Sequence, residues 1–120
     1  MTESPPKPKD VLALAGLKPK KSWGQNFLTD QNILAIIAGH ALNKREIRVV
    51  ELGPGTGALT WHLLKQGGQV LAIERDREIA PVLRQVFEWA DGLDAREEDA
   101  AQLAYAALRA EIGHPLTVVG

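Results

Sequence analysis

Residues 49–60 read VVELGPGTGALT: a short apolar run, a turn with three glycines, and the start of a segment with apolar residues at helical spacing. A β-branched run bounded by glycine is typical of a buried strand, so residues 47–52 are predicted to form one. The glycines of the turn let the backbone bend tightly and approach a ligand, which a Cβ atom would obstruct. The stretch therefore predicts a strand, a ligand-holding turn and a helix. A tight connection without any ligand is the alternative interpretation.

The same alternation of strand and helix continues downstream. Further strands are predicted at 69–74, 93–97 and 116–119, and helices at 58–66, 76–90 and 100–112. Asp76 is expected to cap the second of these helices, with Pro81 in its first turn. Because strands separated by helices need crossover connections, we predict an α/β fold: a doubly wound, mostly parallel sheet with helices on both faces.

Upstream of the glycine turn, the pattern predicts one more helix. Thr29 or Asp30 is expected to cap it, and it should end near Leu42 and Asn43. Its apolar residues at helical spacing are Ile33, Ile36, Ile37 and Ala41. Residues 1–10 contain three prolines and are predicted to be unstructured, with a short helical turn at 11–17.

Composition restricts the class of protein. With 120 residues and 45% hydrophobic content, the chain can build one modest core. The absence of cysteine excludes disulfides and thiolate metal sites, and the three histidines are too scattered to indicate a metal cluster. No apolar run approaches the roughly 18 residues that a membrane span needs, and the start lacks the apolar core of a signal peptide. A cytoplasmic protein without membrane contact is expected.

Charge is distributed unevenly along the chain. Residues 1–21 carry five lysines against two acids, a net charge of +3, which leaves −4 for the remainder. A basic arm of this kind is suited to contact with a phosphate backbone, although a solubilising tail has the same composition.

Two acidic residues restrict the class of ligand that the glycine turn could bind. Glu74 ends the second predicted strand, where a carboxylate can accept hydrogen bonds from both ribose hydroxyls of an adenosine group. Glu51, at the mouth of the turn, would repel a pyrophosphate but suit the ammonium group of a methionine tail. The alternatives are an exposed charged turn at Glu74 and an ion pair of Glu51 with Arg48 or a lysine.

Three segments, in this order and spacing, carry a resemblance to a known family. KKSWGQNFL (20–28), ELGPGTGALT (51–60) and VLAIERD (70–76) closely resemble the rRNA adenine N6,N6-dimethyltransferases, a family that includes bacterial small-subunit enzymes and erythromycin-resistance methylases. The resemblance extends over residues 18–120. It implies a Rossmann-like class I methyltransferase that uses S-adenosyl-L-methionine.

The resemblance also implies roles for particular residues. Those expected at the cofactor are Gln25, Asn26, Leu28, Glu51, Gly53, Gly55, Gly57, Glu74, Arg75, Asp99 and Ala100. Asp99 would accept a hydrogen bond from the adenine amino group, although Glu98 stands where the family usually has glycine. Trp23 is expected to pack the arm down or to stack on a base. No metal is implied.

The implied reaction is dimethylation of the N6 amines of two adjacent adenines in small-subunit (16S) rRNA during ribosome biogenesis. The partners would be this rRNA and the pre-30S particle, and the full-length form would be a monomer. Residues 1–21 are expected to be a basic flexible leader, and residues 22–120 the cofactor-binding N-terminal part of the methyltransferase domain. The family's catalytic Asn-Leu-Pro-Tyr is expected after Gly120, so the 120 residues alone should not methylate RNA.

Two alternatives of other classes stay open. An NAD(P)-dependent oxidoreductase would share the strand, turn and ribose acid, but Glu51 and the spacing G-x-G-x-G in place of G-x-G-x-x-G disfavour it. A non-catalytic RNA-binding or assembly fragment would use the basic arm. Within the family, the housekeeping enzyme is preferred to a resistance methylase.

Overall fold

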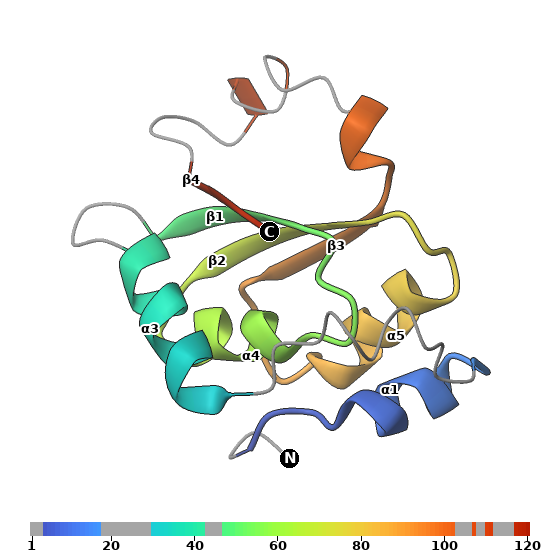
Figure 1. The fold of residues 1–120 in the computed structure, drawn as a ribbon. Helices are drawn as coiled ribbons and strands as arrows, with labels where there is room; N and C mark the ends of the chain where they lie inside the picture. Colours follow the sequence, from blue (N-terminus) through green and yellow to red (C-terminus); the bar gives the residue numbers. More distant parts are fainter. Residues whose placement is uncertain (1–3, 18–29, 43–46, 103–106, 108–109, 112–116) are drawn as a thin grey trace.

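A four-stranded parallel sheet forms the centre of the protein (Figure 1). The computed structural model describes residues 4–17, 30–42, 47–102, 107, 110–111 and 117–120. The strands are β1 (Arg48–Leu52), β2 (Gln69–Glu74), β3 (Leu93–Glu97) and β4 (Thr117–Val119), in the order β3-β2-β1-β4. Val50 of β1 lies opposite Leu71 of β2 on one side and Val118 of β4 on the other. The predicted parallel α/β sheet is confirmed.

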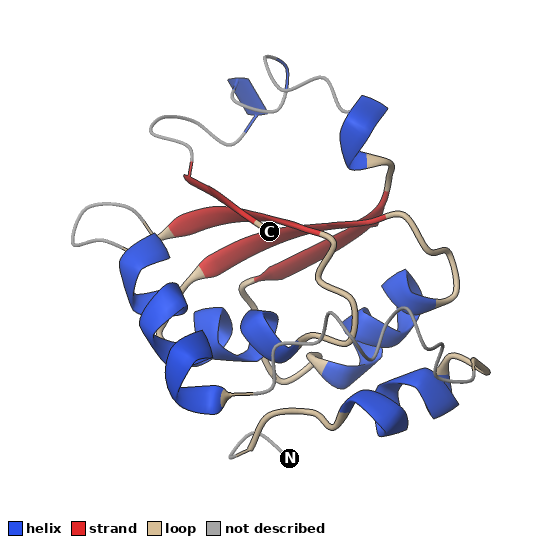
Figure 2. Ribbon diagram, in the orientation of Figure 1, coloured by secondary structure: helices blue, strands red, loops and turns tan. Residues whose placement is uncertain are grey.

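The described helices lie on both faces of this sheet (Figure 2). On one face lie α1 (Pro8–Leu14), α3 (Gln31–Ala41), α4 (Ala58–Lys65) and α5 (Ile79–Val86), and on the other lies the 3-10 helix η1 (Ala100–Gln102). The chain passes from β1 to β2 and on to β3 through α4 and α5. The next strand, β4, pairs with β1 on the side away from β2, and η1, which follows β3 along the chain, lies over the opposite face. None of the described helices is long and apolar enough to cross a membrane.

Alternating strand residues build a core on each face. Val49 and Val70 face the helices and pack with Leu63, Leu83 and Phe87, all at most 2% exposed. The other face has a smaller cluster of Val50, Leu71 and Ile73, against which Leu52 and Ala100 pack. The larger core holds β1 and α4 in place, and the glycine turn connects these two elements.

The start of the chain is more ordered than predicted. Helix α1 begins at Pro8, so the expectation of an unstructured segment is wrong for residues 8–10. Proline is tolerated in the first turn of a helix, and the apolar pair that follows supplies the packing: Val11 and Leu12 are each 1% exposed. The helix packs against α5. The proposed domain boundary at residue 21 lies outside the described residues and stays a prediction.

Helix α3 has its predicted ends but buries a different face. The Asp30 carboxylate accepts hydrogen bonds from the backbone amides of Asn32 and Ile33, at 2.9 and 3.2 Å. Ile33 and Ile36, expected in the core, are 45% and 59% exposed. The buried residues are Leu34, Ala38 and Ala41.

Two polar contacts between α3 and α4 explain this orientation. His62 on α4 makes a 2.7 Å hydrogen bond with the Gln31 side chain, and the Gln66 amide donates to the Ala35 carbonyl at 3.1 Å. Ala38, fully buried, allows the two helices a close approach.

The remaining helices differ from prediction at their ends. Helix α5 spans residues 79–86 rather than 76–90, yet the Asp76 carboxylate accepts from the amides of Glu78 and Ile79 and Pro81 lies in the first turn, as expected. The predicted helix at 100–112 begins instead as the short 3-10 turn η1. Of residues 103–116, only Ala107, Ala110 and Glu111 are described, and all three are helical.

Candidate functional site

The strand order identifies one edge of the sheet as the place for a ligand. The connections on the two sides of β1 run over opposite faces, and in such sheets ligands bind outside the carboxyl ends of the strands at this point. The glycine turn follows the carboxyl end of β1. Gly120 follows β4 and lies directly beside the carboxyl end of β1, since a Cβ atom on Gly120 would come within 3.2 Å of the Leu52 carbonyl oxygen.

The first two glycines of the turn leave its surface open. Gly53 and Gly55 have φ angles of +64° and +58°, in the left-handed region that favours glycine. Among the described residues, nothing lies within 4 Å of a Cβ placed on Gly53, and only the Gly53 carbonyl lies at 4.0 Å from one placed on Gly55. This backbone is therefore accessible to a ligand that would approach it closely.

Gly57 has a different role, because it faces the core. Its φ is +88°, and a Cβ atom there would come within 2.7 Å of the Phe87 ring. Its amide donates to the Pro54 carbonyl at 3.0 Å, which closes the turn before α4. The interpretation of the turn as a tight connection without a ligand accounts for Gly57 but not for the open surface at the other two glycines.

Glu51 lies beneath the turn rather than open at its mouth. It is 3% exposed, and its carboxylate accepts a 2.5 Å hydrogen bond from the Thr60 hydroxyl on α4. Burial raises the pKa of Glu51 to about 7; the Thr60 hydrogen bond opposes this shift and the nearby Glu74 carboxylate adds to it. The sequence analysis did not single out Thr60, although a hydroxyl residue on a helix just after an acid-bearing strand was the available signal.

Glu74 is also buried, at 8% exposed, and both of its carboxylate oxygens contact backbone amides. Oε1 accepts from Gly55 at 3.0 Å, and Oε2 accepts from Asp76 at 2.9 Å. An exposed charged turn, the alternative for this residue, is inconsistent with this burial. The bond to the glycine turn was not predicted, since 19 residues separate its two partners.

The turn after β3 reaches the same edge. The Glu98 amide donates to the Glu74 carbonyl at 3.0 Å, and the Asp99 carboxylate accepts from the Ala101 amide at 2.9 Å. Asp99 therefore caps η1, and it remains partly exposed. Arg75, beside Glu74, is exposed, and Ala100 packs against the Val50 cluster. The other predicted contacts, Gln25, Asn26 and Leu28, together with Trp23, lie outside the described residues.

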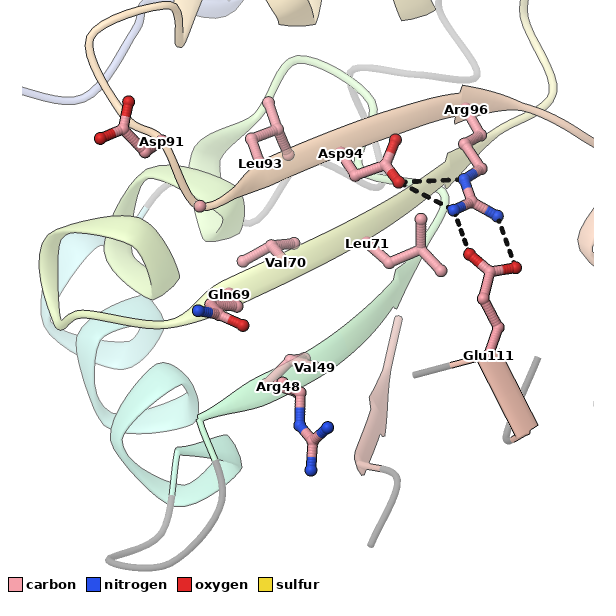
Figure 3. Close-up of a pocket in the computed structure, with 11 residues that line it drawn as sticks. Arg48, Val49, Gln69, Val70, Leu71, Asp91, Leu93, Asp94, Arg96 and Glu111 are labelled. Atoms are coloured by element: carbon pink, nitrogen blue, oxygen red, sulfur yellow. Dashed lines mark hydrogen bonds and ion pairs between the residues drawn. The ribbon is translucent and has the colours of Figure 1, made fainter. Parts of the chain in front are cut away.

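A groove of about 410 Å³ lies away from this edge, at the amino ends of the strands (Figure 3). Arg48, Gln69 and Asp91 line one part of it. In another part, Arg96 lies between Asp94, at 2.9 Å, and Glu111, and these two hydrogen-bonded carboxylates raise the pKa of the Arg96 guanidinium. The groove includes no residue of the glycine turn, and we do not assign it to the cofactor site.

No group of three His, Cys, Asp or Glu side chains that could hold a metal ion occurs within the part of the chain that the structure describes. The chemistry of the carboxyl edge is therefore that of two buried carboxylates, a partly exposed one and open backbone.

Comparison with known proteins identifies the family. Residues 16–120 match the family model described as ribosomal RNA adenine dimethylase. The ribosomal RNA small subunit methyltransferase A of Anaeromyxobacter dehalogenans (strain 2CP-C) is 46% identical over 96% of this chain and 40% of its own length. The protein of the same name from Erythrobacter litoralis is 43% identical over 99% of this chain and 41% of its own. The chain thus spans about 40% of the length of these relatives.

Solved structures agree with this result. The 23S rRNA methyltransferase ErmE has 32% sequence identity and a TM-score of 0.59, over 65% of this chain and 32% of that one. The N-terminal domain of EvdMO1, solved with SAH bound, has 25% identity and a TM-score of 0.63, over 77% of this chain and 39% of that one. The predicted Rossmann-like methyltransferase fold is confirmed, and the chain belongs to the ribosomal RNA adenine dimethylase family.

Proposed function

We propose that the carboxyl edge of the sheet binds S-adenosylmethionine and that, together with an Asn-Leu-Pro-Tyr segment that holds the adenine, it serves to methylate N6 amines of adenines in small-subunit rRNA. The observation that carries the proposal is the open glycine turn at Gly53 and Gly55, with two buried carboxylates beside it, in a chain of this family. The cofactor supplies an electrophilic methyl group on a sulfonium.

The charge of the edge fits this cofactor better than a dinucleotide. Glu51 and Glu74 lie within the edge, and together they favour the ammonium and sulfonium groups of a methionine tail. An ionised Glu51 next to the glycine turn would repel a pyrophosphate, which dinucleotide-binding folds hold at this turn, whereas the ribose acid Glu74 suits both kinds of cofactor. This argument, together with the family, favours the methyltransferase over the nicotinamide-dependent alternative.

In this proposal different residues of the chain contact the methionine, ribose and adenine parts of the cofactor. Backbone at Gly53 and Gly55 contacts the methionine portion, the Glu74 carboxylate accepts from the ribose, and Asp99 accepts from the adenine amino group. Gln25, Asn26 and Leu28 would lie over the bound molecule. Glu51, whose pKa is about 7, lies beneath the turn, too buried to reach a ligand directly, and in its ionised form it favours the cationic tail.

Methyl transfer also needs groups that hold the target adenine. The lone pair of its exocyclic amine is delocalised into the ring, so the amine must be oriented toward the methyl group. The family uses Asn-Leu-Pro-Tyr for this, and the 120 residues contain no such motif. Gly120 beside Leu52 would bring a motif that follows β4 next to the glycine turn.

An experiment with radiolabelled S-adenosylmethionine tests both the binding of the cofactor and the need for the Asn-Leu-Pro-Tyr motif in methyl transfer. The chain is incubated with the tritiated-methyl cofactor and with small ribosomal subunits that lack the adenine modification. We expect label to be retained on the protein and not incorporated into RNA. Retention competed by NADH as well as by unlabelled cofactor would contradict the proposed cofactor. Incorporation into RNA would contradict the need for the missing motif.

The relatives favour small-subunit rRNA as the substrate. Identity to the two small-subunit methyltransferases is 43–46% over nearly the whole chain, against 32% over 65% for the 23S rRNA enzyme. The pre-30S particle in the cytoplasm is accordingly the proposed partner.

The basic arm is the proposed RNA contact of this chain. Deleting residues 1–28 would not test it, because Val11 and Leu12 are buried against the rest of the molecule. Substituting Lys18, Lys20 and Lys21 by glutamine leaves this packing intact. We expect weaker binding to small-subunit rRNA and a shallower salt dependence in a filter-binding assay. Unchanged affinity would assign the lysines to solubility alone.

A further inference from the structure

Glu74 connects three separate turns at the carboxyl edge. Its side chain accepts from Gly55 in the glycine turn and from Asp76 in its own turn, at 3.0 and 2.9 Å. Its main-chain carbonyl accepts from Glu98, in the turn that leads to Asp99, at 3.0 Å. These three bonds give Glu74 a structural role apart from any contact with a ribose.

The chemistry of a carboxylate allows both roles together. Each oxygen has two lone pairs, and each accepts one N–H from the described part of the chain, which leaves one acceptor position on each oxygen with respect to these residues. Hydrogen bonds to an ionised acceptor are stronger than those between neutral groups. The two bonds to the Glu74 side chain are also shielded from water, since Glu74 is only 8% exposed. The two remaining positions match the two hydroxyls of a vicinal diol.

We propose that Glu74 is a positioning residue that fixes the glycine turn and the turns after β2 and β3 before the cofactor arrives. The inference extends the proposed function, since it makes the shape of the methionine subsite depend on the residue assigned to the ribose. Loss of Glu74 would then weaken contacts that the side chain does not itself make.

A glutamine at this position separates the two roles. Glu74→Gln keeps the length and one acceptor oxygen, but its NH₂ group cannot accept the second backbone N–H. One of the two amides, Gly55 or Asp76, must therefore lose its partner even in the free protein. Glu97→Gln is the matched control: Glu97 lies opposite Glu74 in the register of β2 and β3, it carries the same charge, and it is exposed.

Amide hydrogen exchange of the ¹⁵N-labelled chain, measured by NMR without ligand, tests the proposal. In Glu74→Gln we expect exchange at Gly55 or Asp76 to accelerate roughly tenfold or more, with β1 and β2 unchanged and the control at wild-type rates. Wild-type rates at both amides, or the same acceleration in the control, would overturn the proposal. If the glutamine variant unfolds as a whole, Glu74→Asp takes its place, since it keeps the charge but is one methylene too short to reach both amides.

Binding measurements give a second readout. S-adenosylhomocysteine and its analogue without both ribose hydroxyls are titrated into the glutamine variant and the control. A positioning role predicts that Glu74→Gln weakens both ligands, whereas a contact with the ribose alone predicts weakening only of the ligand with hydroxyls, and that result would overturn the inference. Failure of the wild-type chain to bind either ligand would count against the proposed cofactor site, and hydrogen exchange would still decide the role of Glu74.

Discussion

Glu51 is the residue whose burial has the clearest consequence for stability. Its pKa rises from 4.5 to about 7 on folding, so the folded chain binds this proton more tightly than the unfolded chain does. The stabilisation is complete below pH 4.5 and is lost as pH rises through about 7, a change of about 3 kcal/mol. We expect the free energy of unfolding, from urea denaturation, to fall by that order between pH 5 and 8.

Glu51→Gln should remove this part of the pH dependence, because glutamine keeps an acceptor for Thr60 but does not titrate. His62 acts with the opposite sign: burial lowers its pKa from 6.5, so it costs stability as pH falls below that value. The difference between wild type and Glu51→Gln isolates the glutamate. An unchanged slope in the variant would show that Glu51 is ionised in the folded protein throughout this range.

Gly57 is expected to tolerate no side chain. Gly57→Ala combines a φ of +88° with a Cβ that would come within 2.7 Å of Phe87, and we expect a loss of about 2–4 kcal/mol in the free energy of unfolding. Gly67→Ala is the matched control, since its φ is +89° and no described atom lies within 4 Å of its Cβ. The control should lose only about 1–2 kcal/mol. Equal losses would mean that the Phe87 ring moves aside without cost.

Single residues were predictable from sequence where local chemistry decides their place. The glycines, Glu74 and Asp76 were found because each is required by a turn or by the end of a strand. Thr60 as the partner of Glu51, and Gly55 as the partner of Glu74, were not found. These pairs depend on how the turn folds back over two strands, which spacing alone does not specify.

At the scale of elements, the cap of α3 offers a direct test. Asp30→Ala removes the acceptor for two backbone amides, and we expect a loss of about 1 kcal/mol in the free energy of unfolding. Asp30→Asn keeps an acceptor oxygen and should lose much less. Denaturant titration of both variants measures this difference, and an alanine variant as stable as wild type would show that α3 is held by packing alone.

Strands were predicted better than helix faces, for a physical reason. The β2 and β3 segments agree residue for residue, since each begins directly after a glycine, Gly68 and Gly92, that marks the end of the preceding turn. Helix α3 carries two apolar stripes, one with Ile33 and Ile36 and one with Leu34 and Ala38, and periodicity cannot choose between them. Contacts with His62 and Gln66 determine which stripe is buried, and each of these residues is 31 positions away from its partner in the sequence. The start of α1 was not predicted, because the three prolines of residues 1–10 indicated an unstructured segment; burial of Val11 and Leu12 stabilises the helix.

At the scale of the whole molecule, Arg96 joins β3 to Glu111 across the open face of the sheet (Figure 3). The side chains of Arg96, Asp94 and Glu111 are 33%, 58% and 51% exposed, so solvent screens the pairs. We expect Arg96→Gln to lower stability by less than about 1 kcal/mol, and the effect to shrink in 1 M salt. Thermal unfolding at low and high salt measures it. A large loss that salt does not reduce would mean that Arg96 contributes by packing.

The parallel α/β sheet followed from the alternation of strands and helices, whereas the strand order was not predicted. Parallel strands and a return to β4 past β1 place the glycine turn at the point where ligands bind. The side of the sheet on which α1 and α3 lie did not follow, because both helices precede the alternating pattern and packing sets their side. The proposed partners of the protein rest on its family membership more than on the geometry of the sheet.

Calorimetric titration of the 120-residue chain with S-adenosylmethionine and with NADH tests the central claim most directly. We expect S-adenosylmethionine to bind the wild-type chain and the Glu97→Gln control, with affinity reduced roughly tenfold or more in Glu74→Gln, and NADH to give no measurable heat. Circular dichroism of the same samples confirms that each variant is folded. A folded chain that binds NADH as well as S-adenosylmethionine, or that binds neither, would contradict the assignment of this edge to the methyl donor.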